Sequence, residues 1–152
     1  MLRKNCVFFL FCTILSSLLT GCGPKTVAVS GKIVFDGTPG ENISVLFQGK
    51  AGDSKQQAAF GKTGSDGRYS LKLVVDNKSG AMPGDYVVYL SWKDPDADPN
   101  PIEGVTKANP CPYKIPSRAG SGELEFTVPV GGTDKADFEF DSSKEKFTKP
   151  GV

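Results

Sequence analysis

Apolar and polar residues alternate along seven short segments of the chain, and this period-two pattern is the strongest constraint on its fold. The clearest segment is RYSLKLVV at 68–75, where Tyr69, Leu71, Leu73 and Val75 share one side of an extended backbone. Such alternation is typical of a β-strand with one buried face. Since no stretch of ten or more residues carries an apolar stripe at helical spacing, we expect an all-β domain.

The predicted strands are separated by turns rich in Gly, Pro and Asp. They cover residues 27–35, 43–48, 56–63, 68–75, 85–92, 123–130 and 135–141. Asp-Gly pairs in these turns supply the positive φ angles that tight connections require. Seven strands that each have one apolar face bury those faces most simply as a seven-stranded antiparallel β-sandwich.

The alternation also predicts on which face of a strand particular side chains lie. Val130 falls on the buried face of 123–130, together with its neighbours at every second position. Val87 and Tyr89 occupy the second face of 85–92, so this strand is expected to be central or covered on both sides. Tyr86 follows a Pro-Gly-Asp turn, which predicts a corner tyrosine whose hydroxyl caps a loop.

The first 21 residues differ in kind from the rest. Arg3 and Lys4 precede a 14-residue apolar stretch, CVFFLFCTILSSLL at 6–19, which small and polar residues follow. A membrane-spanning helix needs about 20 apolar residues, so this stretch is short for a span. A buried core helix would normally show a polar face. The pattern therefore predicts a secretory signal peptide.

The segment Leu19-Thr20-Gly21-Cys22 resembles the lipobox of bacterial lipoprotein signal peptides. The resemblance implies cleavage between Gly21 and Cys22, a diacylglycerol thioether on the Cys22 sulfur, and usually an amide-linked third chain. Each buried methylene contributes about 0.8 kcal/mol, so two or three chains give a durable membrane anchor. Gly23 stands where an aspartate would favour retention in the inner membrane, so the outer membrane is favoured within the cell envelope.

These boundaries divide the chain into a signal peptide at 1–21, a lipidated tether at 22–26, a sandwich domain at 27–141 and a flexible C-terminal tail at 142–152.

Removing Arg3 and Lys4 with the leader turns the formal net charge of +1 into −1. That balance argues against nucleic acid as a partner, because such partners require a basic patch. The chain contains no histidine, which excludes a Ser-His-Asp or Cys-His site and histidine-ligated zinc. We expect a domain that is not an enzyme and needs no cofactor.

Cysteine usage agrees with an exported protein that lacks disulfides. Cys6 and Cys12 lie in the leader and Cys22 is assigned to lipid, which leaves Cys111. Cys111 lies among prolines in NPCPYKIP and is expected to be a small buried apolar residue. A reactive or intermolecular thiol is the alternative.

Several motifs in order resemble the carboxypeptidase regulatory-like, or transthyretin-like, domains of bacterial lipoproteins. They are VSGKIVFDGTPGENISVLF at 29–47, TGSDGRYSL at 63–71, MPGDYVVYLSW at 82–92 and IPSRAGSGELEFTVPVGGTDKADFEF at 115–140. The resemblance implies a prealbumin-like Greek-key sandwich. It also implies a binding or structural module in the envelope. The transthyretin-related hydrolases depend on histidines, and this chain has none. A partner would be an envelope protein or a polysaccharide.

A connection of 30 residues, 93–122, holds six prolines and is the best place to look for function, since loops of this length are often functional. Within it, Asp94, Asp96 and Asp98 alternate as at the start of a calcium loop. The alternative is a solvated acidic loop, because the glycine and glutamate of a full EF-hand loop are absent.

Three aromatic residues in and near this connection, Tyr89, Trp92 and Tyr113, are candidates for a stacking surface that binds carbohydrate. The alternative is that these rings belong to the core or anchor the loop. On this hypothesis the chain is a carbohydrate-binding lipoprotein, an alternative to a module that binds proteins.

Overall fold

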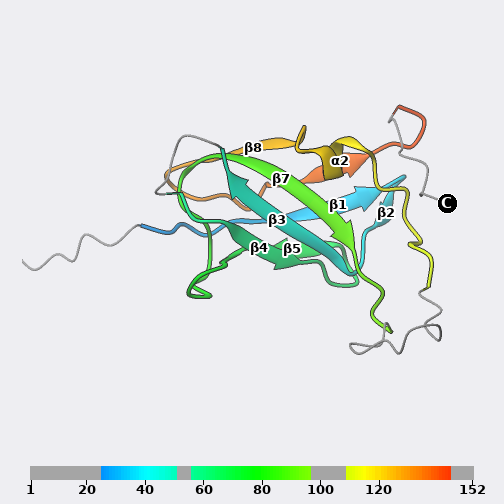
Figure 1. Ribbon diagram of the computed structural model, residues 1–152, viewed down its shortest axis with the longest axis horizontal. Helices are drawn as coiled ribbons and strands as arrows, with labels where there is room; N and C mark the ends of the chain where they lie inside the picture. Colours follow the sequence, from blue (N-terminus) through cyan, green and yellow to red (C-terminus); the bar gives the residue numbers. More distant parts are fainter. Residues whose placement is uncertain (1–24, 51–55, 97–108, 145–152) are drawn as a thin grey trace, which may run out of the picture.

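The computed structural model describes residues 25–50, 56–96 and 109–144, and nearly all of their regular structure lies in two β-sheets (Figure 1). In the first sheet, β1 (Ser30–Phe35) pairs with β2 (Thr38–Pro39), β5 (Arg68–Ser70) and β9 (Phe138–Phe140). The second sheet has the order β6 (Lys72–Leu73), β4 (Ala59–Lys62), β3 (Ile43–Gly49), β7 (Gly84–Trp92) and β8 (Glu125–Val128). The all-β prediction is confirmed, and the arrangement is consistent with a β-sandwich. None of the helices in the described residues is long and apolar enough to cross a bilayer.

The alternation of the sequence builds the core between the sheets. Phe47 of β3 is fully buried, and its ring centroid lies 5.7 Å from that of Tyr86 and 5.7 Å from that of Phe126. It also lies 6.4 Å from Phe138, which belongs to the other sheet. Burying a side chain of this size contributes about 1.5–3 kcal/mol. Phe47 therefore packs the two sheets against each other.

The predicted strand 68–75 is shared between the sheets. Tyr69 pairs with β1, whereas Leu73 pairs with β4, so the chain changes sheet at the buried Leu71. The prediction for Val75 is wrong, because this side chain is 74% exposed. The physical reason is a turn after Leu73, whose carbonyl accepts a hydrogen bond from the backbone N–H of Asn77 at 3.1 Å.

The last strand corrects the prediction of a wholly antiparallel sandwich. β9 pairs with β1 in parallel, with Ile33 opposite Phe138. The turn at 129–132 carries the chain from β8 in one sheet to β9 in the other, so β9 arrives alongside β1 in the same direction. Val130 lies at this turn and is 78% exposed, which overturns its predicted inward position.

The connection between β7 and β8 contains a short helix that the sequence pattern does not predict. α2 (Arg118–Ser121) follows Pro116 and ends at Gly122, whose φ of 84° suits glycine. The helix lies against β7, and Gly122 is so close that an added Cβ would stand 2.9 Å from the Tyr89 hydroxyl. This contact explains why Val87 and Tyr89 are half-buried, as predicted for a strand covered on both faces.

Candidate functional site

The lipidation site lies outside the described residues. Gly21 and Cys22 precede the first described residue, Lys25, so cleavage and lipidation stay predictions. The first backbone bridge among the described residues lies at Val27, ahead of β1, where the Val27 N–H donates to the carbonyl of Ala81 at 2.8 Å. The predicted domain boundary at residue 27 stays a prediction.

The two described ends of the long connection are joined by Asp94. Its carboxylate accepts hydrogen bonds from the backbone N–H of Asn109 at 2.6 Å and from the Asn109 side-chain amide at 3.2 Å. The backbone N–H of Asp96 donates to the same carboxylate at 3.0 Å. These bonds, first among them the one from the Asn109 backbone, lower the pKa of Asp94 below its ordinary value. Asp94 thus closes the base of the loop.

This geometry bears on the calcium hypothesis. Asp94 uses its carboxylate oxygens within the protein, and the third predicted ligand, Asp98, lies outside the described residues. In the described parts of the chain, no three carboxylate, cysteine or histidine side chains gather in a way that would hold a metal ion. The calcium loop therefore stays a prediction.

Tyr113 anchors the connection to the core. Its ring stacks on Phe35 with centroids 5.2 Å apart, and its hydroxyl accepts a hydrogen bond from the backbone N–H of Glu41 at 2.9 Å. Phe35 in turn stacks on Phe140 at 5.3 Å, and the Arg118 guanidinium lies 5.3 Å from the centre of the Phe140 ring. This stack of three rings and one cation fixes both the connection and α2 to the first sheet. Sequence reasoning missed it, because its members are far apart along the chain.

The three aromatic candidates do not form one surface. Tyr89 points away from the core toward α2, whereas Trp92 and Tyr113 are half-buried and pack against the core. Tyr86, which is fully buried, donates its hydroxyl to the carbonyl of Met82 at 2.9 Å. The corner-tyrosine prediction is confirmed, and Tyr86 and Tyr113 hold loops in place.

Cys111 is exposed, so the prediction of a small buried residue is wrong. Pro110 and Pro112 on either side are exposed as well, and this stretch of chain runs along the surface. The thiol donates a hydrogen bond to the carbonyl of Tyr113 at 3.3 Å. The structure therefore gives this cysteine a surface position and a single local contact among those described.

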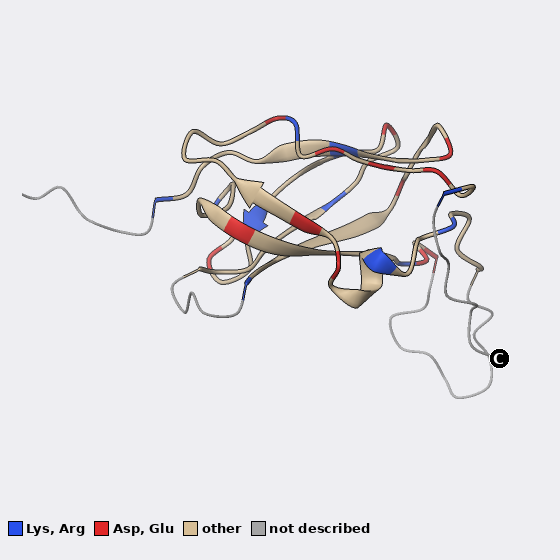
Figure 2. Cartoon of the chain, turned by 90° about the horizontal axis from the view of Figure 1, so that it is seen from above, with Lys and Arg blue, Asp and Glu red and all other residues tan. Residues whose placement is uncertain are grey.

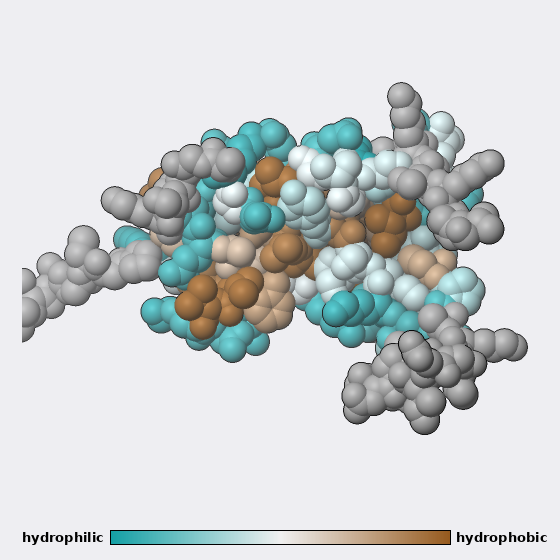
Figure 3. All heavy atoms as spheres, viewed as in Figure 1, coloured by the Kyte–Doolittle hydropathy of each residue, from teal (hydrophilic) through white to brown (hydrophobic). Residues whose placement is uncertain are grey.

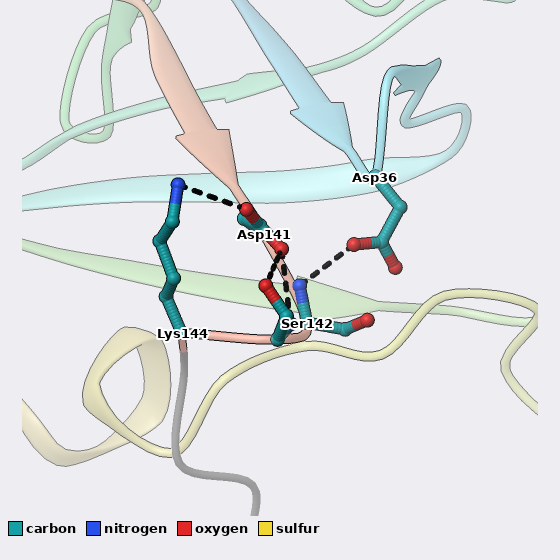
Figure 4. A network of polar contacts seen from close by, with 5 residues as sticks. Asp36, Asp141, Ser142 and Lys144 are labelled. Carbon is teal, nitrogen blue, oxygen red and sulfur yellow. Dashed lines mark hydrogen bonds and ion pairs between the residues drawn. The ribbon is translucent and has the colours of Figure 1, made fainter.

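A polar network holds the chain after β9 (Figure 4). The backbone N–H of Ser142 donates to the carboxylate of Asp36 at 2.6 Å, although the two residues are far apart in sequence. Asp141 accepts from the hydroxyl of Ser143 at 2.6 Å and pairs with Lys144 at 3.1 Å. These bonds lower the pKa of Asp141 to about 2, and the bond from the Ser143 hydroxyl is the largest cause. The first three residues of the predicted tail are thus held by the domain.

A shallow hollow of about 440 Å³ lies beside α2. Its lining residues are Ile115, Pro116, Ser117, Gly120 and Ser121. The lining offers apolar surface and two hydroxyl groups, and none of these side chains titrates near neutral pH. Such a surface can hold a partner by contact and hydrogen bonding, but it offers no general acid or base.

The outer face of the five-stranded sheet carries apolar side chains that sequence reasoning did not single out. Leu46 of β3, which is 37% exposed, stands opposite Phe60 of β4, which is 41% exposed. Tyr89 of β7 is the partner of Leu46 on its other side. Figure 3 shows apolar side chains among polar ones on this face. The available clues were Leu46 and Phe60, which are out of phase with the inward residues of their strands.

Charged residues of both signs are interspersed over the domain (Figure 2). Exposed pairs such as Lys50 with Glu125, at 2.7 Å, place opposite charges together. The face of the five-stranded sheet is thus of mixed charge around its apolar centre.

No family model matches the chain, and neither the curated proteins nor the solved structures contain a match.

Proposed function

We propose that this protein is a lipid-anchored lipoprotein of the cell envelope whose β-domain is a non-enzymatic binding or structural module. The observation that carries the proposal is the short distance along the chain between Cys22 and the fold. The first described backbone bridge is at Val27, so only residues 23–26 separate the lipobox cysteine from it. A lipobox this close to the first bridge would hold the domain near the membrane surface.

The long connection supports a role in binding. Its described ends leave β7 at Trp92 and pack on Phe35 of β1 through Tyr113, at the end of the domain opposite the one where the blue N-terminal segment enters (Figure 1). A domain anchored through its N-terminus would present this end away from the bilayer. The connection and the hollow beside α2 are then available to an envelope protein. A polysaccharide is the alternative partner, although the three candidate aromatics lie apart.

The finer fold assignment belongs to the same proposal. We propose a prealbumin-like, seven-stranded Greek-key sandwich of the carboxypeptidase regulatory-like type, in which β5 and β6 are one strand interrupted at Leu71. β2 is then an extension of the hairpin after β1. In support, each of the seven predicted segments contains a strand.

The non-enzymatic part of the proposal rests on chemistry. The chain has no histidine, and two of the candidate residues, Asp94 and Tyr113, act as loop anchors. Gly23 favours the outer membrane as the location.

Mass spectrometry of the N-terminal peptide from protein expressed in a bacterial host tests the anchor. We expect a chain that begins at Cys22 and carries two or three acyl chains. Cys22→Ser should move the protein from the membrane fraction to the soluble envelope fraction, whereas the matched variant Cys111→Ser should stay with the membrane. An unmodified N-terminus, or membrane association that survives Cys22→Ser, would overturn the proposal.

A further inference from the structure

Three exposed valines lie at one end of the domain. Val74, Val75 and Val130 are 50%, 74% and 78% exposed, and they are the three most exposed large apolar side chains among the described residues. They come from two turns that are far apart in sequence, the one after β6 and the one after β8. Larger exposed apolar patches mark protein or membrane interaction sites, whereas single exposed apolar residues need no explanation, so three at one end of the domain call for one.

Both turns pack against the first residues of the domain. Val27 bridges Ala81, just after the first turn, and Val29 bridges Thr133, just after the second. The approach is so close that a Cβ on Gly80 would meet the Val27 carbonyl oxygen at 2.0 Å, and one on Gly132 would meet that of Ala28 at 2.4 Å. The two turns therefore flank the point where the chain enters the fold. Figure 1 shows them at the end from which the blue N-terminal segment leaves.

Chain length limits what can face this end. Val27 follows Cys22 by five residues, and an extended chain spans at most about 3.5 Å per residue, or about 17 Å in all. If Cys22 is acylated, the entry point of the chain lies within this distance of the membrane surface. Another folded protein does not fit into so narrow a space, whereas the lipid headgroup layer does.

We propose that Val74, Val75 and Val130 form a membrane-contact surface, which inserts into the headgroup and upper acyl region of the bilayer that holds Cys22. This inference rests on the proposed lipidation of Cys22. The surface would fix the orientation of the domain, with the long connection pointing away from the membrane.

The charges around the surface define the lipid. Asp76 pairs with Lys78 at 2.9 Å, so the first turn carries balanced charge next to its valines. The second turn, 129–133, contains no charged residue. Contact through apolar side chains without a basic cluster does not depend on anionic lipid. Phosphatidylcholine is therefore a sufficient test membrane.

Tryptophan quenching by brominated lipid tests the contact. The lipidated full-length mature protein would be reconstituted in phosphatidylcholine vesicles with brominated acyl chains, with unbrominated vesicles as reference. Val75→Trp in a Trp92→Phe background places the only tryptophan in the surface, and the native protein, with Trp92 at the opposite end of β7, is the matched control. We expect at least about twofold quenching at position 75 and little at Trp92. Only a side chain that inserts past the headgroups reaches the brominated acyl chains, and Trp92 lies at the other end of the domain.

A second substitution checks that the valines act together. Val130→Asp added to the Val75→Trp protein should reduce the quenching, since a buried charge opposes insertion. Both positions are exposed, so we expect these variants to fold, and circular dichroism verifies this. Mass spectrometry of Cys22 in the same samples separates the two proposals.

Each outcome is decisive. Acylated Cys22 with quenching at position 75 alone supports the contact surface. Acylated Cys22 with no quenching at 75, or with equal quenching at 75 and 92, overturns it and leaves the proposed function intact. Unmodified Cys22 overturns the proposed function, and the membrane-contact surface with it.

Discussion

The hydroxyl of Tyr69 donates a hydrogen bond of 2.6 Å to the carbonyl oxygen of Ala136. Tyr69 is 3% exposed and lies in β5, whereas Ala136 lies just before β9, 67 residues later in the chain. Gly31 of β1 is the strand partner of Tyr69, and a Cβ at this glycine would lie 2.0 Å from the same carbonyl oxygen. The Ala136 carbonyl therefore sits in a niche between Gly31 and the Tyr69 hydroxyl.

Replacing Tyr69 with Phe should lower the free energy of unfolding by about 1–2 kcal/mol, because the buried Ala136 carbonyl loses a hydrogen-bond donor. Urea denaturation followed by circular dichroism measures this change. The matched control is Tyr113→Phe, whose hydroxyl accepts from an exposed backbone N–H and should cost about 0.5 kcal/mol or less. Equal losses in the two variants would contradict the burial argument.

The same tyrosine predicts a loss of stability at high pH. Burial, aided by the negative charge of Asp137, raises the pKa of Tyr69 above its ordinary value of 10.0. Below pH 10 both the folded and the unfolded chain keep the proton, so this contribution is fully present. Above pH 10 the unfolded chain loses its proton first, and stability falls as the pH rises. The urea midpoint of the native protein should therefore decrease more between pH 9 and about 11 than that of Tyr69→Phe; parallel curves would contradict this prediction.

Asp141 should titrate at about pH 2, well below its ordinary value of 3.8. Because its folded-state pKa is lowered, the stability that it contributes is present above pH 4 and is lost as the pH falls toward 2. Carboxyl carbon chemical shifts in an NMR titration measure this pKa. Ser143→Ala should raise this pKa, since the Ser143 hydroxyl is the largest single cause of the shift. An unchanged pKa in this variant would contradict the prediction.

The bonds of Asp94 predict that it limits the opening of the long connection. Asp94→Ala should increase the rate of proteolytic cleavage within 95–108, because the carboxylate no longer joins Asn109 to the strand end. Asp96→Ala is the control, since this residue contributes its backbone N–H and keeps it. Limited digests with calcium and with chelator are analysed by mass spectrometry, which measures the rate of cleavage within 95–108. Cleavage that depends on calcium rather than on the substitution would favour the metal-loop hypothesis.

The sequence was sufficient to predict the parts of this fold that depend on local pattern. The alternation in 43–48 and 85–92 predicted the buried Val45, Phe47, Val88 and Leu90, because one inward face follows from a period of two. The Tyr86 corner was predicted as well, since it needs only a neighbouring turn. These features depend on residues close together in the chain.

What the sequence did not predict depends on contacts between distant segments. The parallel partner of β1 follows from the crossing at 129–132, and the ring stack of Tyr113 on Phe35 joins residues 78 positions apart. Val75 and Val130 were placed inward because alternation continues beyond the residue where a strand ends. Cys111 was expected to be buried on its apolar character, although the flanking Pro110 and Pro112 are typical of a loop on the surface. For the candidate site, the loop was identified and anchoring by Tyr113 was one of the two interpretations, but the bonds of Asp94 to Asn109 were not predicted.

The niche around the Ala136 carbonyl predicts that Gly31 tolerates no side chain. Gly31→Ala would place a Cβ 2.0 Å from a backbone oxygen and 2.4 Å from the carbonyl carbon, so the segment before β9 must move away from β1. This movement would also strain the Tyr69 hydrogen bond and the bond from the Ala136 N–H to the Ser30 carbonyl, at 3.1 Å. We expect a loss of about 2–3 kcal/mol in the free energy of unfolding, as for overpacking that shifts backbone.

Gly120→Ala is the matched control for Gly31→Ala. Gly120 lies within α2, and an added Cβ there meets nothing within 4 Å. Alanine is the better helix former by about 1 kcal/mol, so this variant should be as stable as the native protein or slightly more stable. Urea denaturation of both variants compares the same chemical change at the two sites. A Gly31→Ala protein as stable as Gly120→Ala would mean that β9 does not dock against β1 through the Ala136 carbonyl, and the parallel pairing of these strands would then need another source of stability.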